Sequence, residues 1–167
     1  MASSSGVSIQ VLGLDELRRD MRKPESVLKP AERALDKASA KTMELAVKGA
    51  PSDRGHLRNS ITIDRLKRFV RRVGSGLPYA KPVEFGSRPH WPPLASLQPW
   101  ARRHGFPAGR QGAFLVARAI ARHGTKAKPF LNPALDRVET HEWPRIQREF
   151  NAEVGIEYER AGRRSGR

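Results

Sequence analysis

The chain has 167 residues, of which 38% are hydrophobic, and 32 lysines and arginines against 17 acidic residues give it a formal net charge of +15. This length suits one domain with a sizeable core. The absence of cysteine excludes a disulfide framework, a thiol nucleophile and a cysteine-ligated zinc site. No apolar run approaches the roughly 20 residues of a membrane span, and residues 1–6 lack the apolar stretch of a signal peptide. We therefore expect no membrane partner.

The positive charge is concentrated in the middle of the chain. Residues 1–50 have a net charge of +2, residues 51–128 of +13, and residues 129–167 of zero. So basic a segment predicts contact with a polyanion or with an acidic partner surface.

The first predicted elements are a strand and two helices. Apolar and polar residues alternate over residues 7–11, which predicts a short half-buried strand. A short helix is expected at 14–19. Apolar residues recur at three- and four-residue intervals over 30–48, which predicts a long amphipathic helix with Pro30 in its first turn. Its many alanines indicate close packing onto a sheet.

The middle of the chain predicts a strand pair followed by two helices. Residues 61–63 and 69–73 have strand character, and glycines at 74 and 76 end the second strand. A short helix is expected at 95–104. A longer one is expected at 112–123, with four residues facing inward: Phe114, Ala117, Ile120 and Ala121.

Near the C-terminus, Asn132 followed by proline predicts an N-cap and a helix that runs toward Phe150, with a kink at Pro144. Alternation over 154–158 predicts a last strand. We therefore expect a single α+β domain over 1–167, in which a small antiparallel or mixed sheet packs against a long amphipathic helix and two or three further helices. Residues 1–6 are expected to be frayed, and the basic tail 161–167 to be mobile.

The sequence offers little for catalysis. None of the five histidines forms a pair with recognised metal-ligand spacing, and no Walker-type glycine loop is present. Asp53 and Glu84 could bind magnesium in a nuclease, but an acid in so basic a segment more often caps a turn or pairs with an arginine. We expect no enzymatic activity, no metal and no cofactor.

Two basic groups are candidates for contact with DNA or with an acidic partner. The first comprises Arg65, Lys67, Arg68, Arg71 and Arg72, and the second comprises Arg102, Arg103 and Arg110. The first group is either a solvated hairpin or a phosphate-binding one, because clustered cations displace counterions. No base-reading motif is present, so base-specific readout is not indicated. The alternative function is that of a stand-alone basic nucleic-acid-binding protein.

Three segments in order resemble one family. They are residues 50–61 (APSDRGHLRNSI), 78–91 (PYAKPVEFGSRPHW) and 123–135 (HGTKAKPFLNPAL). They resemble the tail-completion, or head–tail joining and minor tail, proteins of long-tailed bacteriophages and prophages. The resemblance covers about residues 9–135, with departures at Ser52, Arg54 and Ser87. Residues 89–112 resemble the insert of a subset with an extra helix.

The resemblance implies a structural virion protein without catalytic residues. It would form a homo-oligomeric ring, expected to be a hexamer, in the neck at the head–tail junction, and it would assemble in the host cytoplasm. Its partners would be neighbouring neck, tail-terminator or tail-tube proteins, with non-specific contact to DNA in the channel. The motif positions that match are candidates for fold or subunit contacts: Asp53, Gly55, Ser60, Tyr79, Glu84, Phe85, Gly86, Pro129 and Phe130.

Overall fold

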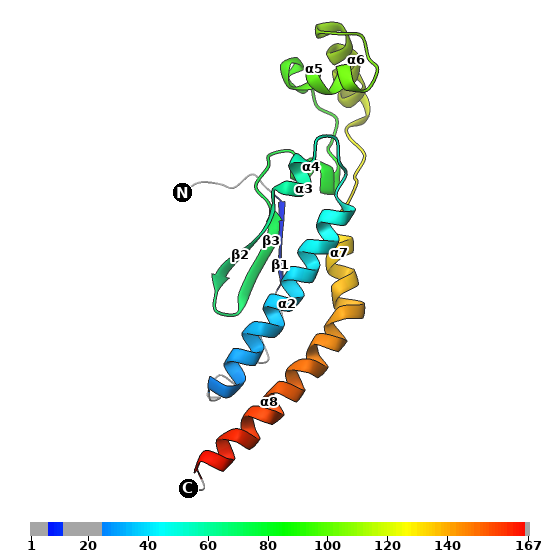
Figure 1. Ribbon diagram of the computed structural model, residues 1–167. Helices are drawn as coiled ribbons and strands as arrows, with labels where there is room; N and C mark the ends of the chain where they lie inside the picture. The colour runs from blue at the N-terminus through cyan, green and yellow to red at the C-terminus, as the bar shows by residue number, and fades with distance from the viewer. Residues whose placement is uncertain (1–6, 12–24, 166–167) are drawn as a thin grey trace. The chain divides into compact units, whose positions relative to one another are not determined.

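The computed structural model describes residues 7–11 and 25–165, and these fall into two compact units (Figure 1). Unit 1 comprises the chain up to Ala80 and from Pro129 onward, and unit 2 comprises Lys81–Lys128. The helix expected at 14–19 and the frayed start at 1–6 lie outside the described residues. The insert expected at 89–112 falls within unit 2.

Unit 1 contains a three-stranded antiparallel sheet with the strand order β1-β3-β2. Its strands are β1 (Val7–Val11), β2 (Ile61–Lys67) and β3 (Val70–Ser75). Strand β1 has the predicted bounds. Strand β2 is four residues longer than expected, so the hairpin turn contains only Arg68 and Phe69. The register shifts between Arg65 and Lys67, which marks a bulge near that turn.

Helix α2 (Glu25–Gly49) is the central element of unit 1. It packs on β2 and β3 and also on the C-terminal helices of the unit. The long helix was predicted, but Pro30 does not lie in its first turn, because the helix begins five residues earlier. Val27 in the added segment is buried, and this burial supports the longer helix. The small α3 (His56–Asn59) follows.

The small residues of α2 let other elements approach closely. Ala34 and Ala38 form a buried cluster with Val138 and Ile146 of the C-terminal helices, as close packing of alanines predicts. Two buried hydroxyls on α2 are satisfied within the helix. Ser39 Oγ donates to the carbonyl four residues earlier at 2.7 Å, and Thr42 Oγ1 does the same at 2.9 Å.

The C-terminal part of unit 1 is helical throughout its described length, in three consecutive segments: α7 (Asn132–Arg137), the π-helical η1 (Val138–Glu142) and α8 (Trp143–Ser165). Asn132 was expected to be the N-cap, but Leu131 takes that position and no side chain caps the helix. The irregularity expected at Pro144 occurs as the π turn just before it. Proline has no N–H to donate, and its ring would clash with the carbonyl four residues earlier.

The prediction of a strand at 154–158 is wrong, because these residues continue helix α8. Glutamates four residues apart, Glu149 and Glu153, line up on one face of the helix. They form ion pairs with Lys37 at 2.9 Å and Arg33 at 3.0 Å, which lie four residues apart on α2. Contacts with α2 therefore outweigh a local alternation that also fits a strand. Residues 161–165 of the expected mobile tail belong to the same helix.

Unit 2 contains α5 (Leu94–Arg103), α6 (Arg110–His123) and all of α4 (Ala80–Phe85) except its first residue, which belongs to unit 1. Helices α5 and α6 match the two that the sequence predicts and pack on each other. Ala117 faces inward as predicted and is buried with Ala113. The prediction for Phe114 is wrong, because its side chain is exposed. The buried residues of α6 are small ones, Gly112, Ala113 and Ala117, whereas Phe114 and Leu115 are exposed. The α+β fold class is confirmed.

Candidate functional site

Two arginines of the β2–β3 hairpin share one carboxylate on α2. Arg65 donates to Asp36 Oδ2 at 2.8 Å, and Arg71 Nε donates to Asp36 Oδ1 at 2.6 Å. Arg65 and Arg71 are cross-strand partners in the β2–β3 register. Like charges in such a position repel each other, and Asp36 offsets that repulsion while it ties the hairpin to α2.

Arg71 has a structural role in this hairpin. Only 2% of the residue is exposed. Its Nη1 donates to the backbone carbonyls of Lys67 and Arg68, both at 3.0 Å, so the guanidinium holds the turn between the strands. A guanidinium that is buried and bonded in this way is not accessible to a phosphate.

The other cations of the hairpin differ in their pairing. Arg68 forms an ion pair with Glu32 of α2, and Arg72 pairs with Asp64 across the strands at 2.8 Å. Lys67 is exposed, and we find no ion pair for it within the described segments. Four of the five hairpin cations are thus neutralised by acids of unit 1. Phosphate contact by this group stays a prediction, with less free charge to support it than the sequence suggests.

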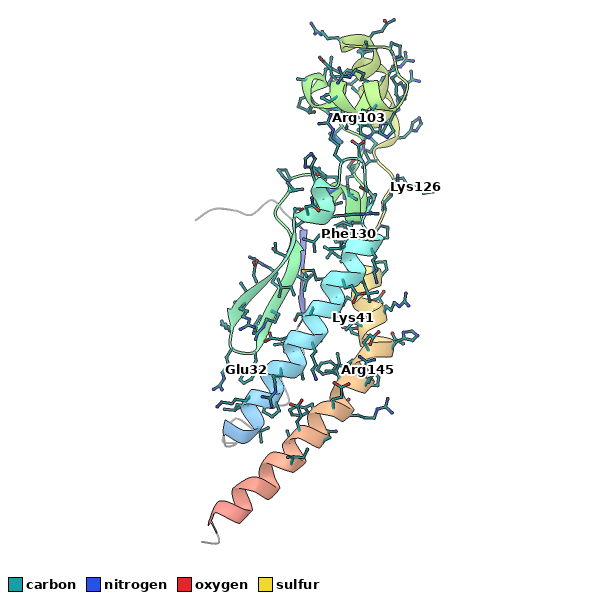
Figure 2. All side chains as sticks on the ribbon, viewed as in Figure 1. Glu32, Lys41, Arg103, Lys126, Phe130 and Arg145 are labelled. Atoms are coloured by element: carbon teal, nitrogen blue, oxygen red, sulfur yellow. The ribbon has the colours of Figure 1, made fainter. Side chains whose placement is uncertain are left out.

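Unit 2 carries a more strongly unbalanced charge. It contains nine lysines and arginines and a single acid, which gives a net charge of +8. That acid, Glu84, is buried. Arg102 and Arg103 end α5, Arg110 begins α6, and all three are exposed. Arg103, labelled in Figure 2, donates to the Pro99 carbonyl at 2.8 Å.

Exposed aromatic side chains accompany this charge. Trp91 meets Phe114 edge to face with ring centroids 5.6 Å apart. Trp100 stacks on His104 at 4.0 Å and lies 6.1 Å from Phe106. The sequence analysis missed these contacts, because residues 77–112 show little periodicity and the rings meet through the tertiary fold.

The first resembling segment forms a turn that joins α2 to the sheet. Gly55 has φ +77° and takes the N-cap position of α3, as a turn glycine should. Ser60 Oγ donates to the Leu57 carbonyl at 2.7 Å and shares a hydrogen bond with Ser75 Oγ of β3 at 2.7 Å. Asp53 is exposed in the bend before α3.

Gly86 permits a tight backbone pairing between two segments of unit 2. Ser87 and Thr125 exchange two backbone hydrogen bonds, both of 3.1 Å. Gly86 has φ +75°, and a Cβ there would lie 2.6 Å from the Thr125 carbonyl oxygen, which no real side chain tolerates. Only glycine therefore fits this position without a shift of the backbone.

The aromatic motif residues fall into two classes. Phe130 is buried and packs against the end of α2, where a Cβ on Gly49 would meet it at 3.8 Å. Phe85 is 58% exposed and Tyr79 is 45% exposed, so neither belongs to the core. Pro129 is exposed at the start of the second part of unit 1.

Asp53 and Glu84, the two candidate nuclease carboxylates, differ in exposure. Asp53 is exposed in unit 1, and Glu84 is buried in unit 2. Magnesium at a hydrolytic site needs carboxylates that a substrate can reach, which Glu84 does not offer. Within residues 7–11 and 25–165, no group of three or more histidines and acids is placed to hold a metal ion.

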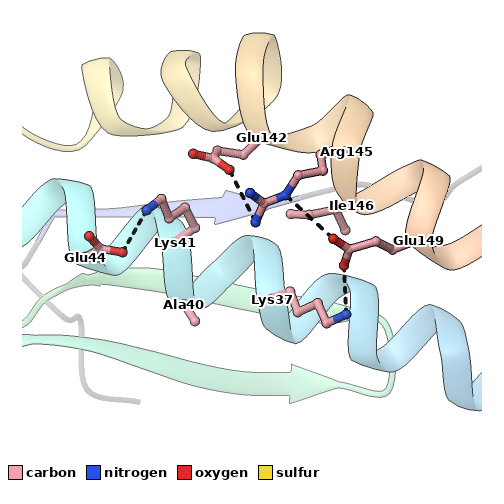
Figure 3. Close-up of a pocket in the computed structure, with 8 residues that line it drawn as sticks. All are labelled: Lys37, Ala40, Lys41, Glu44, Glu142, Arg145, Ile146 and Glu149. Atoms are coloured by element: carbon pink, nitrogen blue, oxygen red, sulfur yellow. Dashed lines mark hydrogen bonds and ion pairs between the residues drawn. The ribbon is translucent and has the colours of Figure 1, made fainter.

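A groove of about 350 Å³ lies between α2 and the C-terminal helices (Figure 3). Three basic and three acidic side chains line it, together with Ala40 and Ile146. Hydrogen bonds and charge from Lys48 and Lys41 lower the pKa of Glu44 to about 2. Lys37 likewise lowers the pKa of Glu149, mainly through its hydrogen bond. These carboxylates are committed to ion pairs, so the groove has the character of a helix–helix seam.

One comparison with known proteins matches part of the chain to a phage family. Residues 15–86, which include α2, the β2–β3 hairpin and α4, match the model of the HK97-gp10-like family, described as "Bacteriophage HK97-gp10, putative tail-component". The resemblance expected from the sequence is thereby confirmed for this segment, and the description supports a structural role in a phage tail. No curated protein and no solved structure matches the chain. None of the helices in the described segments is long and apolar enough to cross a membrane.

Proposed function

We propose that this chain is a structural virion protein that forms a ring at the head–tail junction, completes the tail and joins it to the capsid connector. The observation that carries the proposal is the match of residues 15–86 to a family of phage tail components. The resembling segment at 123–135, which lies outside that match, stays a prediction from the sequence and would extend the likeness into α7.

Exposed motif residues support a role in assembly. Phe85 and Tyr79 lie in the resembling segment 78–91 and expose about half of their surface. Large apolar side chains at the surface are typical of protein–protein contacts. In the proposed ring they contact neighbouring subunits, and a hexamer is the expected stoichiometry. The neighbouring neck, tail-terminator or tail-tube proteins are the other partners. The exposed lysines and arginines of unit 2 are available to contact DNA in the channel.

The experiment is complementation of a phage that lacks this gene. Without the protein we expect filled heads and uncompleted tails to accumulate separately, and the wild-type chain to restore joined particles seen by electron microscopy. Phe85→Ser is expected to abolish joining. Leu66→Ser is the matched control, because Leu66 is similarly exposed on β2 but lies outside the three resembling segments. Normal joining in the absence of the protein, or by Phe85→Ser, contradicts the proposal.

A second candidate function is that of a stand-alone nucleic-acid-binding protein, which the net charge of +8 on unit 2 favours. It predicts that the isolated chain binds a DNA duplex with an affinity that falls steeply as salt rises. Substitution of Arg102, Arg103 and Arg110 by glutamine is expected to weaken this binding and its salt dependence together. A salt-independent or undetectable interaction rules the function out.

A further inference from the structure

The outer face of α6 presents apolar side chains to solvent. Trp91 is 54% exposed and Phe114 is 44% exposed, and the two rings contact each other at the surface. Leu115, which follows Phe114 on α6, is also exposed. Since burial of apolar surface contributes about 25 cal/mol per Å², three large neighbouring side chains left in water indicate a surface that another molecule covers.

Two exposed arginines extend this surface along α6. Phe114, Arg118 and Arg122 follow each other at four-residue intervals, so they lie on one face of α6, and both arginines are exposed. We call Trp91, Phe114, Leu115, Arg118 and Arg122 the α6 outer face. Tryptophan and arginine are the residues most enriched at the energetic centres of protein interfaces.

The charge around this face selects the occupant. The only acid of unit 2 is buried, so every charged side chain exposed on this unit is basic. The same unit of a second copy is a poor occupant, because its exposed charged side chains are all basic as well. Duplex DNA would pair with Arg118 and Arg122, but its phosphates offer nothing apolar to Trp91 and Phe114.

We propose that the α6 outer face is a docking surface for an acidic protein whose apolar side chains are rimmed by aspartate or glutamate. The apolar side chains of that partner cover Trp91, Phe114 and Leu115, and its carboxylates pair with Arg118 and Arg122. Electrostatic attraction speeds the encounter and fixes the orientation, and the apolar contact supplies most of the affinity. The docking surface does not depend on the ring proposed above.

The test is calorimetric titration of the full chain with three probes. They are a synthetic amphipathic peptide of leucine and glutamate, poly-glutamate of the same charge, and a short DNA duplex. We expect the amphipathic peptide to bind at least about tenfold more tightly than poly-glutamate. Phe114→Ser is expected to remove that advantage, and Leu66→Ser, which alters an exposed leucine of β2, to preserve it.

A second variant keeps the test decisive if Phe114→Ser disturbs the fold. The double variant Arg118→Gln, Arg122→Gln is expected to weaken the binding of both acidic probes by a similar factor. Its melting temperature should be unchanged, because both arginine side chains are exposed. Equal affinity for the two acidic probes overturns the proposal, since charge alone then accounts for binding. Tighter, steeply salt-dependent binding of the duplex overturns it in favour of nucleic acid, and unchanged binding by both variants excludes this face.

Discussion

Asp36 and Arg71 show how a cation in a basic run becomes part of the fold. Asp36 comes from the first fifty residues, which are nearly neutral, and Arg71 comes from the basic middle. Their contact spans 35 positions of sequence. A charge count along the chain cannot detect such a pair, and this is why Arg71 was grouped with candidate phosphate contacts.

Arg71→Gln is expected to destabilise unit 1 by about 2 kcal/mol, because it removes a charged hydrogen bond and two bonds to carbonyls. The loss is moderate because the Asp36 side chain is 36% exposed and water can solvate it. Arg72→Gln is the control, since its ion pair with Asp64 lies at the surface and contributes under about 1 kcal/mol. Urea unfolding of both variants measures the difference, and equal losses contradict a structural role for Arg71.

Gly86→Ala is expected to destabilise unit 2 by about 1–3 kcal/mol or more, because alanine is strained at positive φ and its Cβ would lie 2.6 Å from the Thr125 carbonyl oxygen. Hydrogen exchange at the Ser87 and Thr125 amides should accelerate. Gly76→Ala serves as the control, since its Cβ would meet nothing within 4 Å. Unchanged protection of both amides in Gly86→Ala refutes the argument.

At the scale of elements, α2 and α8 are joined by both apolar packing and charge. Ala34, Ala38 and Ile146 form the apolar part of the seam, and Lys37 and Arg33 pair with glutamates of α8 at its edge. Surface ion pairs contribute little singly. Their regular four-residue spacing on both helices fixes which faces meet, and so complements the packing.

Glu149→Gln is expected to lower the melting temperature at neutral pH and to have no effect in strong acid. Lys37 lowers the pKa of Glu149 in the folded chain. The stabilisation is therefore complete above the unfolded pKa, near 4.5, and disappears as the pH falls through the lower folded value. Melting curves of both chains across this pH range test whether the stabilisation by Glu149 disappears as the pH falls. Glu139→Gln, at an exposed position on η1, is the control, and a difference that persists at low pH contradicts the linkage.

Periodicity in the sequence predicted α2, α5, α6 and all three strands of the sheet, because each has a strong local pattern. It failed where two patterns coincide. Residues 154–158 alternate like a strand, but pairing of α8 with α2 keeps them helical. It also placed Phe114 inside, whereas the buried residues of α6 are the small Gly112, Ala113 and Ala117. The choice between faces of a helix depends on its neighbour, and the sequence alone does not reveal that neighbour.

At the scale of the molecule, the basic middle of the chain divides between two environments. Residues 51–80 belong to unit 1, where acids of α2 neutralise several of their cations. Residues 81–128 form unit 2, whose exposed charges are all basic. The sequence shows that this segment is basic. Which of its cations stay free to attract a partner depends on ion pairs between residues far apart in the sequence, and a charge count does not reveal these.

Excision of residues 88–124, with Asn-Gly in their place, is expected to leave unit 1 folded. Ser87 and Thr125 already exchange two backbone hydrogen bonds, so a two-residue turn can close the gap between them. The buried cluster of Ala34, Ala38, Val138 and Ile146 lies entirely within unit 1.

Circular dichroism should show a helix loss limited to α5 and α6, with cooperative melting within a few degrees of the full chain. Binding of the acidic amphipathic peptide should disappear, because the excision removes the whole α6 outer face. Broad, non-cooperative melting would show that unit 1 depends on unit 2 for its stability. Retained peptide binding would place the docking surface on unit 1, where the neutralised cations of the hairpin give no physical reason to expect it.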